Sequence, residues 1–319
     1  MKDISIPLKL IKFLSDGEVH SGQQLGQELG MSRAGINKHI QTIREWGVEV
    51  LTLPGKGYCF PISMDLLDSK IIADYLPNDH IEVIPVIDST NQYLLEKLPE
   101  LNSGDSCVAE YQYAGRGRRG RQWISAFGRN LYLSMYWRLE QGPAAAIGLS
   151  LVVGIVIAEV LNRQGAKNVK VKWPNDLYLD DKKLAGILVE LTGKTGDAAQ
   201  IVIGIGINIS ISNEQQKIIN QKSTSLLHTG MTVERNKLVA EIIIELKKAL
   251  VQFEKEGLSP FISRWFELDN FINRPVKLII GDQETCGIAR GIDQQGALLL
   301  DINGVVTPYI GGEISLRGC

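Results

Sequence analysis

The sequence has few of the residues that build disulfide, zinc or redox centres. It contains four cysteines and four histidines in 319 residues, and no two cysteines form a C-x-x-C pair. Scattered thiols favour a reducing compartment and argue against a disulfide framework. We therefore expect a cytoplasmic protein without a zinc site.

The chain also lacks a strong net charge and an uninterrupted membrane-spanning segment. Its net charge is −2, so no field of the whole protein attracts nucleic acid, and any DNA binding has to be local. The first residues lack the apolar core of a signal peptide. Residues 144–161 are apolar, but Gly148, Gly154 and Glu159 interrupt them, which favours a buried helix. We expect no membrane partner.

What is present is a run of nine residues, from Gly115 to Trp123, with four arginines among three glycines. Glycine allows the backbone to approach a ligand closely, and arginine offers a planar set of donors for phosphate or carboxylate. Tryptophan offers a flat face for a ring. This run, called the arginine loop below, predicts a mobile segment that closes over an anionic ligand with a flat group, most simply a nucleotide. The alternative is a solvated basic loop.

Two short matches to nucleotide-binding motifs are rejected on their context. Gly115, Gly117 and Gly120 fit G-x-G-x-x-G, but a strand-like segment follows where that fingerprint needs a helix. Residues 192–195 resemble the end of a P-loop, yet Leu188 stands where the P-loop needs glycine. We therefore expect neither a Rossmann fold nor a P-loop.

Residues 1–63 predict a winged helix-turn-helix domain. Apolar spacing indicates two short helices with Gly30 in the turn between them, followed by a hairpin with a basic tip. The polar face of the second helix carries donors and cations suited to base edges and phosphates. The predicted DNA-binding residues are Ser32, Arg33, Asn37, Lys38, Gln41, Arg44 and, at the hairpin tip, Lys56. The alternative is a protein-binding module that contacts no DNA.

The remaining chain predicts two further domains. Residues 64–271 combine hairpin-linked strands with late, single helices, which indicates mixed α+β rather than regular βαβ units. Residues 272–319 alternate short apolar runs with turns rich in Gly and Asp, which suits a small β-barrel. The strand predicted at 184–191 is either an exposed edge, available to a second subunit, or a buried central strand.

Several polar segments fall at predicted strand ends or turns, where binding sites are commonly built. Taken singly, each has a structural alternative as a turn or a cap. As a set, they resemble the motifs of biotin protein ligases. The matching segments are Ser89-Thr90-Asn91, Gly115-Arg116-Gly117-Arg118 with Trp123, Lys172-Trp173-Pro174-Asn175-Asp176, Lys183-Leu184-Ala185-Gly186 and Gly204-Ile205-Gly206-Ile207-Asn208.

With the helix-turn-helix ahead of these motifs, the chain is similar to the bifunctional ligases of enteric bacteria that also repress the biotin operon. The resemblance implies a class II synthetase-like catalytic domain and a C-terminal SH3-like barrel. It also implies a role for each matching residue. Biotin is expected to contact Ser89, Thr90, Asn91, Gln112, Gly115, Arg116, Arg118, Lys183, Gly186 and Gly204. The nucleotide is expected to contact Arg118, Arg121, Trp123, Asn175, Asn208 and Arg317.

The expected catalytic residues are Arg118, Lys183 and Asp176, and Asp176 is also the expected contact to Mg²⁺ or to the acceptor lysine. The implied reaction joins biotin to ATP as biotinyl-5′-AMP, then moves biotin to a lysine of the biotin carboxyl carrier protein of acetyl-CoA carboxylase. An adenylate-bound homodimer is expected to bind biotin operator DNA. The alternatives are a lipoate ligase, whose Arg-Arg-x-Ser-Gly-Gly-Gly motif is absent here, and a ligand-sensing repressor without ligase activity.

Overall fold

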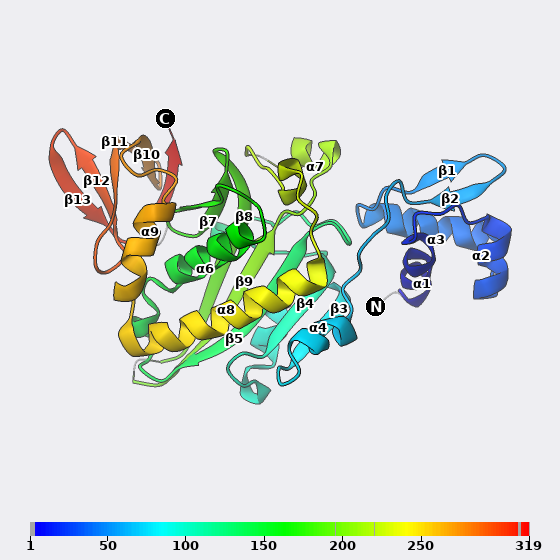
Figure 1. The fold of residues 1–319 in the computed structure, drawn as a ribbon, viewed down its shortest axis with the longest axis horizontal. Helices are drawn as coiled ribbons and strands as arrows, with labels where there is room; N and C mark the ends of the chain where they lie inside the picture. The colour runs from blue at the N-terminus through cyan, green and yellow to red at the C-terminus, as the bar shows by residue number, and fades with distance from the viewer. Residues whose placement is uncertain (1–3, 195, 220, 312–313, 319) are drawn as a thin grey trace.

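The computed structural model describes residues 4–194, 196–219, 221–311 and 314–318. Figure 1 shows an elongated molecule, with a small helical head at one end, a large sheet covered by helices in the middle, and a small sheet at the other end. Short 3-10 helices lie at Leu98–Glu100, Arg118–Gly120, Pro143–Ala146, Leu226–Thr229 and Ser259–Phe261.

The head consists of α1 (Ser5–Leu14), α2 (Gly22–Leu29) and α3 (Arg33–Glu45), followed by a hairpin of β1 (Leu51–Leu53) and β2 (Gly57–Cys59). Ser21 and Ser32 cap α2 and α3 by accepting hydrogen bonds from backbone amides inside each helix. Gly30 has φ +64°, which permits the tight turn between the two helices. These elements confirm the predicted winged helix-turn-helix.

The central sheet has the strand order β3-β4-β5-β9-β8-β7-β6, and every adjacent pair is antiparallel except β3 and β4. This mixed arrangement confirms the predicted α+β class. The strands are β3 (Ile81–Ile87), β4 (Ser106–Gln112), β5 (Leu131–Leu139), β6 (Lys170–Lys172), β7 (Asp176–Leu179), β8 (Lys182–Thr192) and β9 (Ala199–Ile207). The helices are α4 (Ser69–Tyr75), α5 (Thr90–Glu96), α6 (Leu149–Arg163), α7 (Asn213–Ile218), α8 (Arg235–Glu256) and α9 (Ile262–Leu268).

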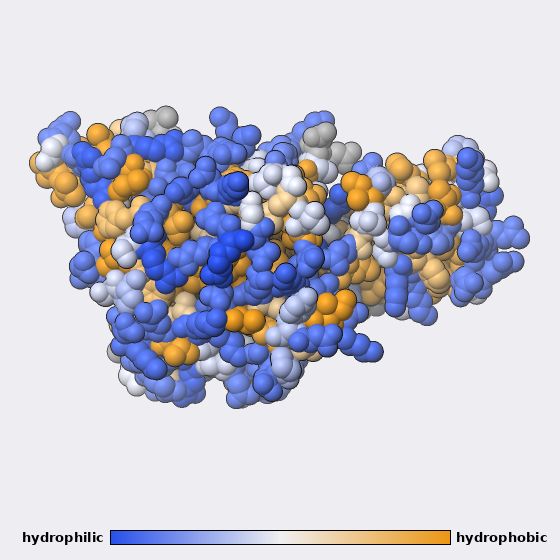
Figure 2. Space-filling view, in the orientation of Figure 1, coloured by the Kyte–Doolittle hydropathy of each residue, from blue (hydrophilic) through white to orange (hydrophobic). Residues whose placement is uncertain are grey.

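Helices α6 and α8 cover one face of this sheet, and Figure 2 shows that the outer surface over α8 is mostly hydrophilic. Ile203 and Ile205 of β9 pack under these helices in the main core. Because side chains alternate along a strand, Gly204 and Gly206 face the opposite side. Residues 143–163 are apolar and long enough to cross a membrane, but 61% of the most apolar window is buried, as predicted for a core helix. Gly148 has φ +85° and separates the preceding 3-10 turn from α6, so the helix begins at Leu149 rather than at 144.

The C-terminal sheet is antiparallel, with the strand order β13-β12-β11-β10-β14. Its strands are β10 (Pro275–Ile280), β11 (Gln283–Ile292), β12 (Leu298–Ile302), β13 (Val305–Tyr309) and β14 (Ile314–Gly318). The Trp173 indole donates a 3.1 Å hydrogen bond to the Gly296 carbonyl, which ties this sheet to the central domain. Residues of the edge strand β14 line the same cavity as Lys172 of β6 and Tyr178 of β7.

A buried ion pair joins the segment after the head to the central sheet. Arg235, at the start of α8, is 3% exposed and lies 2.7 Å from Glu110 of β4. The same guanidinium donates to the backbone carbonyls of Asp65 and Asn130, and Glu110 accepts from the Leu67 amide. The charge of Arg235 is therefore paired and both terminal nitrogens of its guanidinium are hydrogen-bonded, while its buried Nε has no hydrogen-bond partner among the described residues.

The head also contacts the chain just beyond the arginine loop. Trp46, at the end of α3, stacks on Phe127 with ring centroids 5.6 Å apart, and the Phe127 amide donates to the Trp46 carbonyl. Tyr111 stacks on the same indole at 6.2 Å. Trp46 at the end of α3 and the segment just after the arginine loop are therefore in direct apolar contact.

We expect Glu110→Ala to lower the free energy of unfolding by about 3–5 kcal/mol, because it leaves the Arg235 charge buried without a partner. Chemical denaturation would measure this. Arg138→Ala, at an exposed ion pair, is the control and is expected to leave stability unchanged. If Glu110→Ala lowered the free energy of unfolding by less than about 1 kcal/mol, the effect would be no larger than that of a surface ion pair and would contradict the role given to the buried Glu110–Arg235 pair.

Candidate active site

A cavity of about 970 Å³ lies on the sheet face opposite α6 and α8. Strands β8 and β9 form its floor, the arginine loop covers it, and β14 borders it. Its size is at the upper end of the range for small-molecule sites, which gives room for a two-part ligand. Among the described lining residues nine are basic and two are acidic. The basic ones are Arg116, Arg118, Arg119, Arg121, Lys172, Lys183, Lys222, Arg274 and Arg317, and the acidic ones are Asp176 and Asp181.

Glycines on the floor allow the arginine loop to close. A Cβ at Gly206 would lie 2.6 Å from the Trp123 indole, and a Cβ at Gly186 would lie 2.9 Å from it. A Cβ at Gly204 would lie 2.2 Å from the Asn91 side chain. Only glycine accommodates these approaches, so the floor is shaped for a flat group held against the sheet.

The arginine loop is folded as a closed hairpin in this structure. The Trp123 amide donates to the Gly115 carbonyl at 2.9 Å, and the Gly117 amide donates to the Arg121 carbonyl at 2.7 Å. Arg119 at the tip has φ +60°. Arg116 pairs with Glu190 of β8 at 2.8 Å, and Arg118 donates to Asn175 at 2.9 Å. These contacts fix the loop to β8 and to the turn between β6 and β7.

One end of the cavity is lined by neutral, buried polar groups. The Thr90 amide and hydroxyl both donate to the Gln112 side-chain oxygen, at 2.8 and 3.1 Å. The Ser134 hydroxyl of β5 donates to the Asn91 side-chain oxygen and lies 2.7 Å from the Thr90 hydroxyl. Ser89 is 4% exposed and caps α5. This end suits an uncharged ligand group with donors and acceptors.

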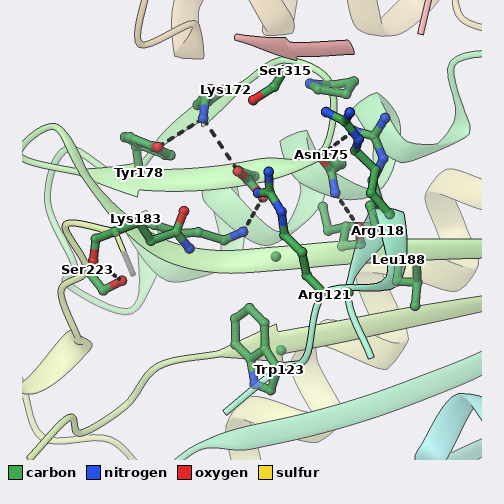
Figure 3. Close-up of a pocket in the computed structure, with 18 of the residues that line it drawn as sticks. Arg118, Arg121, Trp123, Lys172, Asn175, Tyr178, Lys183, Leu188, Ser223 and Ser315 are labelled. Carbon is green, nitrogen blue, oxygen red and sulfur yellow. Dashed lines mark hydrogen bonds and ion pairs between the residues drawn. The ribbon is translucent and has the colours of Figure 1, made fainter. Parts of the chain in front are cut away.

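The other end is built on a buried carboxylate between two lysines. Asp176 lies 2.7 Å from Lys183 and 3.6 Å from Lys172, and in Figure 3 both labelled lysines point into the same part of the cavity. Burial opposes ionisation of Asp176, but the two ammonium charges outweigh it and hold its pKa below the ordinary value. Burial lowers the pKa of Arg118, and Asp176 offsets this in part.

The structure brings the predicted ligand-binding residues together. Those assigned to biotin and nucleotide line the one cavity, except Gly115, which is buried behind Trp123. Asn175 and Asn208 also hold backbone: their side-chain amides donate to the carbonyls of Ile187 and Thr224. Sequence reasoning did not assign Ser134, Tyr178 or Ser223. The single polar residue in the apolar segment 131–137 was a signal for Ser134.

The described residues contain no group of three or more His, Cys, Asp or Glu side chains arranged to hold a metal. Asp176 was the expected Mg²⁺ contact, but its two oxygens face Lys183 and Lys172. Asp181, the other carboxylate among the described residues that line the cavity, pairs with Arg274 at 2.7 Å. This donor set does not fit a Mg²⁺ ion held by the protein alone.

Most predicted DNA-binding residues lie on the exposed face of the head. Exposed side chains belong to Ser32, Arg33, Asn37, Lys38, Gln41 and Lys56. Arg44 differs, because its guanidinium donates to the Val50 carbonyl and to Thr52, and so holds the hairpin against α3. A groove of about 640 Å³ between α2 and the hairpin is bordered by Arg33 and Lys56.

Comparison with known proteins agrees with this architecture. The model of the Biotin/lipoate A/B protein ligase family matches residues 83–208, an HTH domain matches 8–59, and the Biotin protein ligase C terminal domain matches 271–317. The bifunctional ligase/repressor BirA of Salmonella typhimurium is 67% identical over 99% of both chains, and that of Escherichia coli is 65% identical over the same shares. The chain belongs to the bifunctional biotin protein ligase family.

A solved structure supports this assignment independently. The biotin protein ligase of Aquifex aeolicus in complex with biotin and ATP aligns with a TM-score of 0.65 and 28% identity, over 75% of this chain and 99% of that one. This protein is therefore a ligase that carries an N-terminal helix-turn-helix domain.

We expect Asp176→Asn to remove a pH-dependent part of the ligase's stability. Because the native pKa of Asp176 is lowered, its contribution is complete above the ordinary value of 3.8 and is lost as pH falls through the native pKa. The difference in unfolding free energy between parent and variant should therefore stay constant at neutral pH and narrow below about pH 4. Denaturant titrations across this range would measure it.

Asp269→Asn is the matched control, because burial raises the pKa of Asp269. A raised native pKa reverses the direction in which stability changes with pH, so protonation of Asp269 favours the folded state as pH falls. As pH falls, the difference in unfolding free energy between parent and variant should narrow for Asp176→Asn and widen for Asp269→Asn. Parallel pH curves for parent and Asp176→Asn would contradict the ion pairing described for Asp176.

Proposed function

We propose that this ligase joins biotin to ATP as biotinyl-5′-AMP and transfers biotin to a lysine of a biotin carboxyl carrier protein. The observation that carries the proposal is the single cavity with a neutral polar end near Thr90 and Gln112 and a strongly basic end around Asp176. The neutral end suits the ureido ring of biotin, and the basic end suits its carboxylate beside the phosphates of ATP.

In the first step a biotin carboxylate oxygen attacks the α-phosphorus of ATP. The bond from that phosphorus to the bridging oxygen breaks, and pyrophosphate leaves with the electron pair. No enzyme nucleophile is needed, which suits a cavity whose described lining contains no Ser–His or Cys–His pair. Arg118 and Lys183 hold the two anions together and neutralise the charge that develops on phosphate.

In the second step the acceptor lysine, as a free amine, attacks the acyl carbon of the mixed anhydride, and AMP leaves. Until then the adenylate has to be kept from water. The closed hairpin of the arginine loop, with Trp123 seated on Gly186 and Gly206, provides that shield. Asp176 is the proposed contact for the incoming lysine because it is the acidic group nearest to Lys183.

We propose that Mg²⁺ enters with ATP, bound by phosphate oxygens, since the described carboxylates of the cavity are already paired with cations.

The proposed domain boundaries are 1–63, 64–271 and 272–319. The head is proposed to bind biotin operator DNA through the exposed face of α3 and the hairpin tip. Arg33 and Lys56, which border the groove, would contact DNA phosphates and so position the head on the DNA.

We further propose that the adenylate-bound ligase is a homodimer that pairs through half of β8. Strand β7 pairs with β8 only at residues 182–186, so β8 is central there. From Leu188 to Thr192, the pairing described for β8 is with β9 alone. The N-terminal half of β8 is thus a central strand, and its C-terminal half is an edge strand. Leu191 is 38% exposed on the free half, where a second copy could add a strand.

Biotin-dependent exchange of labelled pyrophosphate into ATP tests the proposed reaction. We expect exchange by the parent protein and a loss of about 100-fold or more in Lys183→Met, because a charge-stabilising donor is removed. Lys182→Met changes the adjacent, exposed lysine and should stay close to the parent. Exchange with lipoate alone would favour a lipoate ligase, and biotin binding without exchange would favour a sensor that has no ligase activity.

The molar mass of the ligase in solution is expected to double when biotin and ATP are added, and analytical ultracentrifugation would detect this. Leu191→Asp should keep the protein monomeric, since a charge would be buried at the pairing edge. Val251→Asp is the control, because Val251 is similarly exposed but lies on α8, away from the edge. An unchanged sedimentation coefficient of the parent with both ligands would end the dimer proposal.

A further inference from the structure

Lys172 has a buried ammonium group without a full counter-charge. It lies on β6, is 8% exposed, and donates a 3.0 Å hydrogen bond to the Tyr178 hydroxyl. Its nearest carboxylate oxygen, on Asp176, is 3.6 Å away, while the other oxygen of Asp176 is taken by Lys183 at 2.7 Å. One carboxylate therefore serves two ammonium groups, and Lys172 has the weaker share.

The surroundings of Lys172 add to this deficit of negative charge. Burial lowers its pKa, Asp176 restores part of the difference, and the positive charges of Arg317 and Arg121 lower it again. A buried cation with incomplete compensation costs free energy. An anion that enters the cavity beside Lys172 would recover that free energy, so the arrangement favours binding of a polyanion.

The two lysines serve different parts of the cavity. Lys183 lies over the Trp123 ring at 5.7 Å, near the glycine floor. Lys172 lies on the other side of Asp176, beside Tyr178, and it lines the cavity together with Ser315 of β14. A ligand with its flat group and carboxylate junction near Trp123 and Lys183 would therefore extend its far phosphates toward Lys172.

We propose that Lys172 binds the β- and γ-phosphates of ATP and neutralises pyrophosphate as it leaves, with the Tyr178 hydroxyl as a second donor. This rests on the proposed adenylation of biotin. As the bond from the α-phosphorus to the bridging oxygen breaks, the electron pair stays on that oxygen, and the Lys172 ammonium stabilises the added charge without giving up a proton. Tyr178 accepts from Lys172 and so keeps its own O–H proton for a phosphate oxygen.

The proposal predicts that Lys172 serves one half of the reaction only. Formation of the adenylate, and its reversal by pyrophosphate, involve the leaving group. Transfer of biotin from a finished adenylate to a lysine does not. A residue that only maintained the fold of the cavity would affect both halves alike.

The test compares the two half-reactions in Lys172→Met. We expect pyrophosphate exchange to fall by about 100-fold, the range for loss of one charge-stabilising donor, with a raised KM for pyrophosphate. Single-turnover transfer from synthetic biotinyl-5′-AMP to the carrier protein should stay within about threefold of the parent, because pyrophosphate takes no part in that step. Lys172→Arg should restore part of the exchange because it keeps the charge.

Lys170→Met is the matched control. Lys170 lies two residues away on the same strand, but its ammonium group donates to the Glu267 carbonyl instead of reaching the cavity. Tyr178→Phe keeps the ring and removes only the hydroxyl, so it remains informative if Lys172→Met fails to fold, and it should raise the KM for pyrophosphate but leave transfer unchanged.

Equal loss of both half-reactions in Lys172→Met, or no loss of exchange, would overturn the proposal. So would a Tyr178→Phe variant with unaltered KM for pyrophosphate if Lys172→Met does not fold. A parent protein that shows no biotin-dependent exchange would instead reject the proposed function, so the two failures are distinguishable.

Discussion

The ion pairs of Asp176 are the interaction on which the site depends. Among the described residues, nine basic side chains line one cavity, and Asp181, the second acidic group of that lining, is engaged by Arg274. Asp176 alone stands between Lys172 and Lys183 in the described part of the site. Without that carboxylate the two buried ammonium groups would repel each other and lose their charges or positions. With it they are held in place before a ligand arrives, which is the condition for electrostatic catalysis.

The fold brings to this cluster what the chemistry needs. The antiparallel pairing of β6 and β7 sets Lys172 opposite Asp176, and the pairing of β7 and β8 brings Lys183 beside it. Alternation along β9 sends its isoleucines into the core and its glycines to the ligand face, where Trp123 can seat. The exit of the arginine loop meets the head at Trp46 and Phe127. A conformational change in the arginine loop can therefore be transmitted to α3 through this apolar contact.

Local patterns in the sequence predicted much of this. Apolar periodicity and capping serines were sufficient for the helix-turn-helix, and strand alternation for most of the central sheet, because these signals act within a few residues. The arginine loop was predicted as a ligand-binding segment from its composition. What the sequence could not show depends on pairing between distant strands. The sharing of Asp176 by two lysines, the binding of Arg44 to the hairpin and the free half of β8 all arise from register, which has no local signature.

A crystal structure of the protein with biotin and a non-hydrolysable ATP analogue tests the central claim most directly. We expect the phosphates to lie among Arg118, Lys183 and Lys172, with the adenine against Trp123 and the biotin ring beside Thr90 and Gln112. The lysines should turn at least partly from Asp176 to phosphate oxygens. Phosphates bound outside the arginine loop, or lysines that keep Asp176 as their only anionic partner, would contradict it.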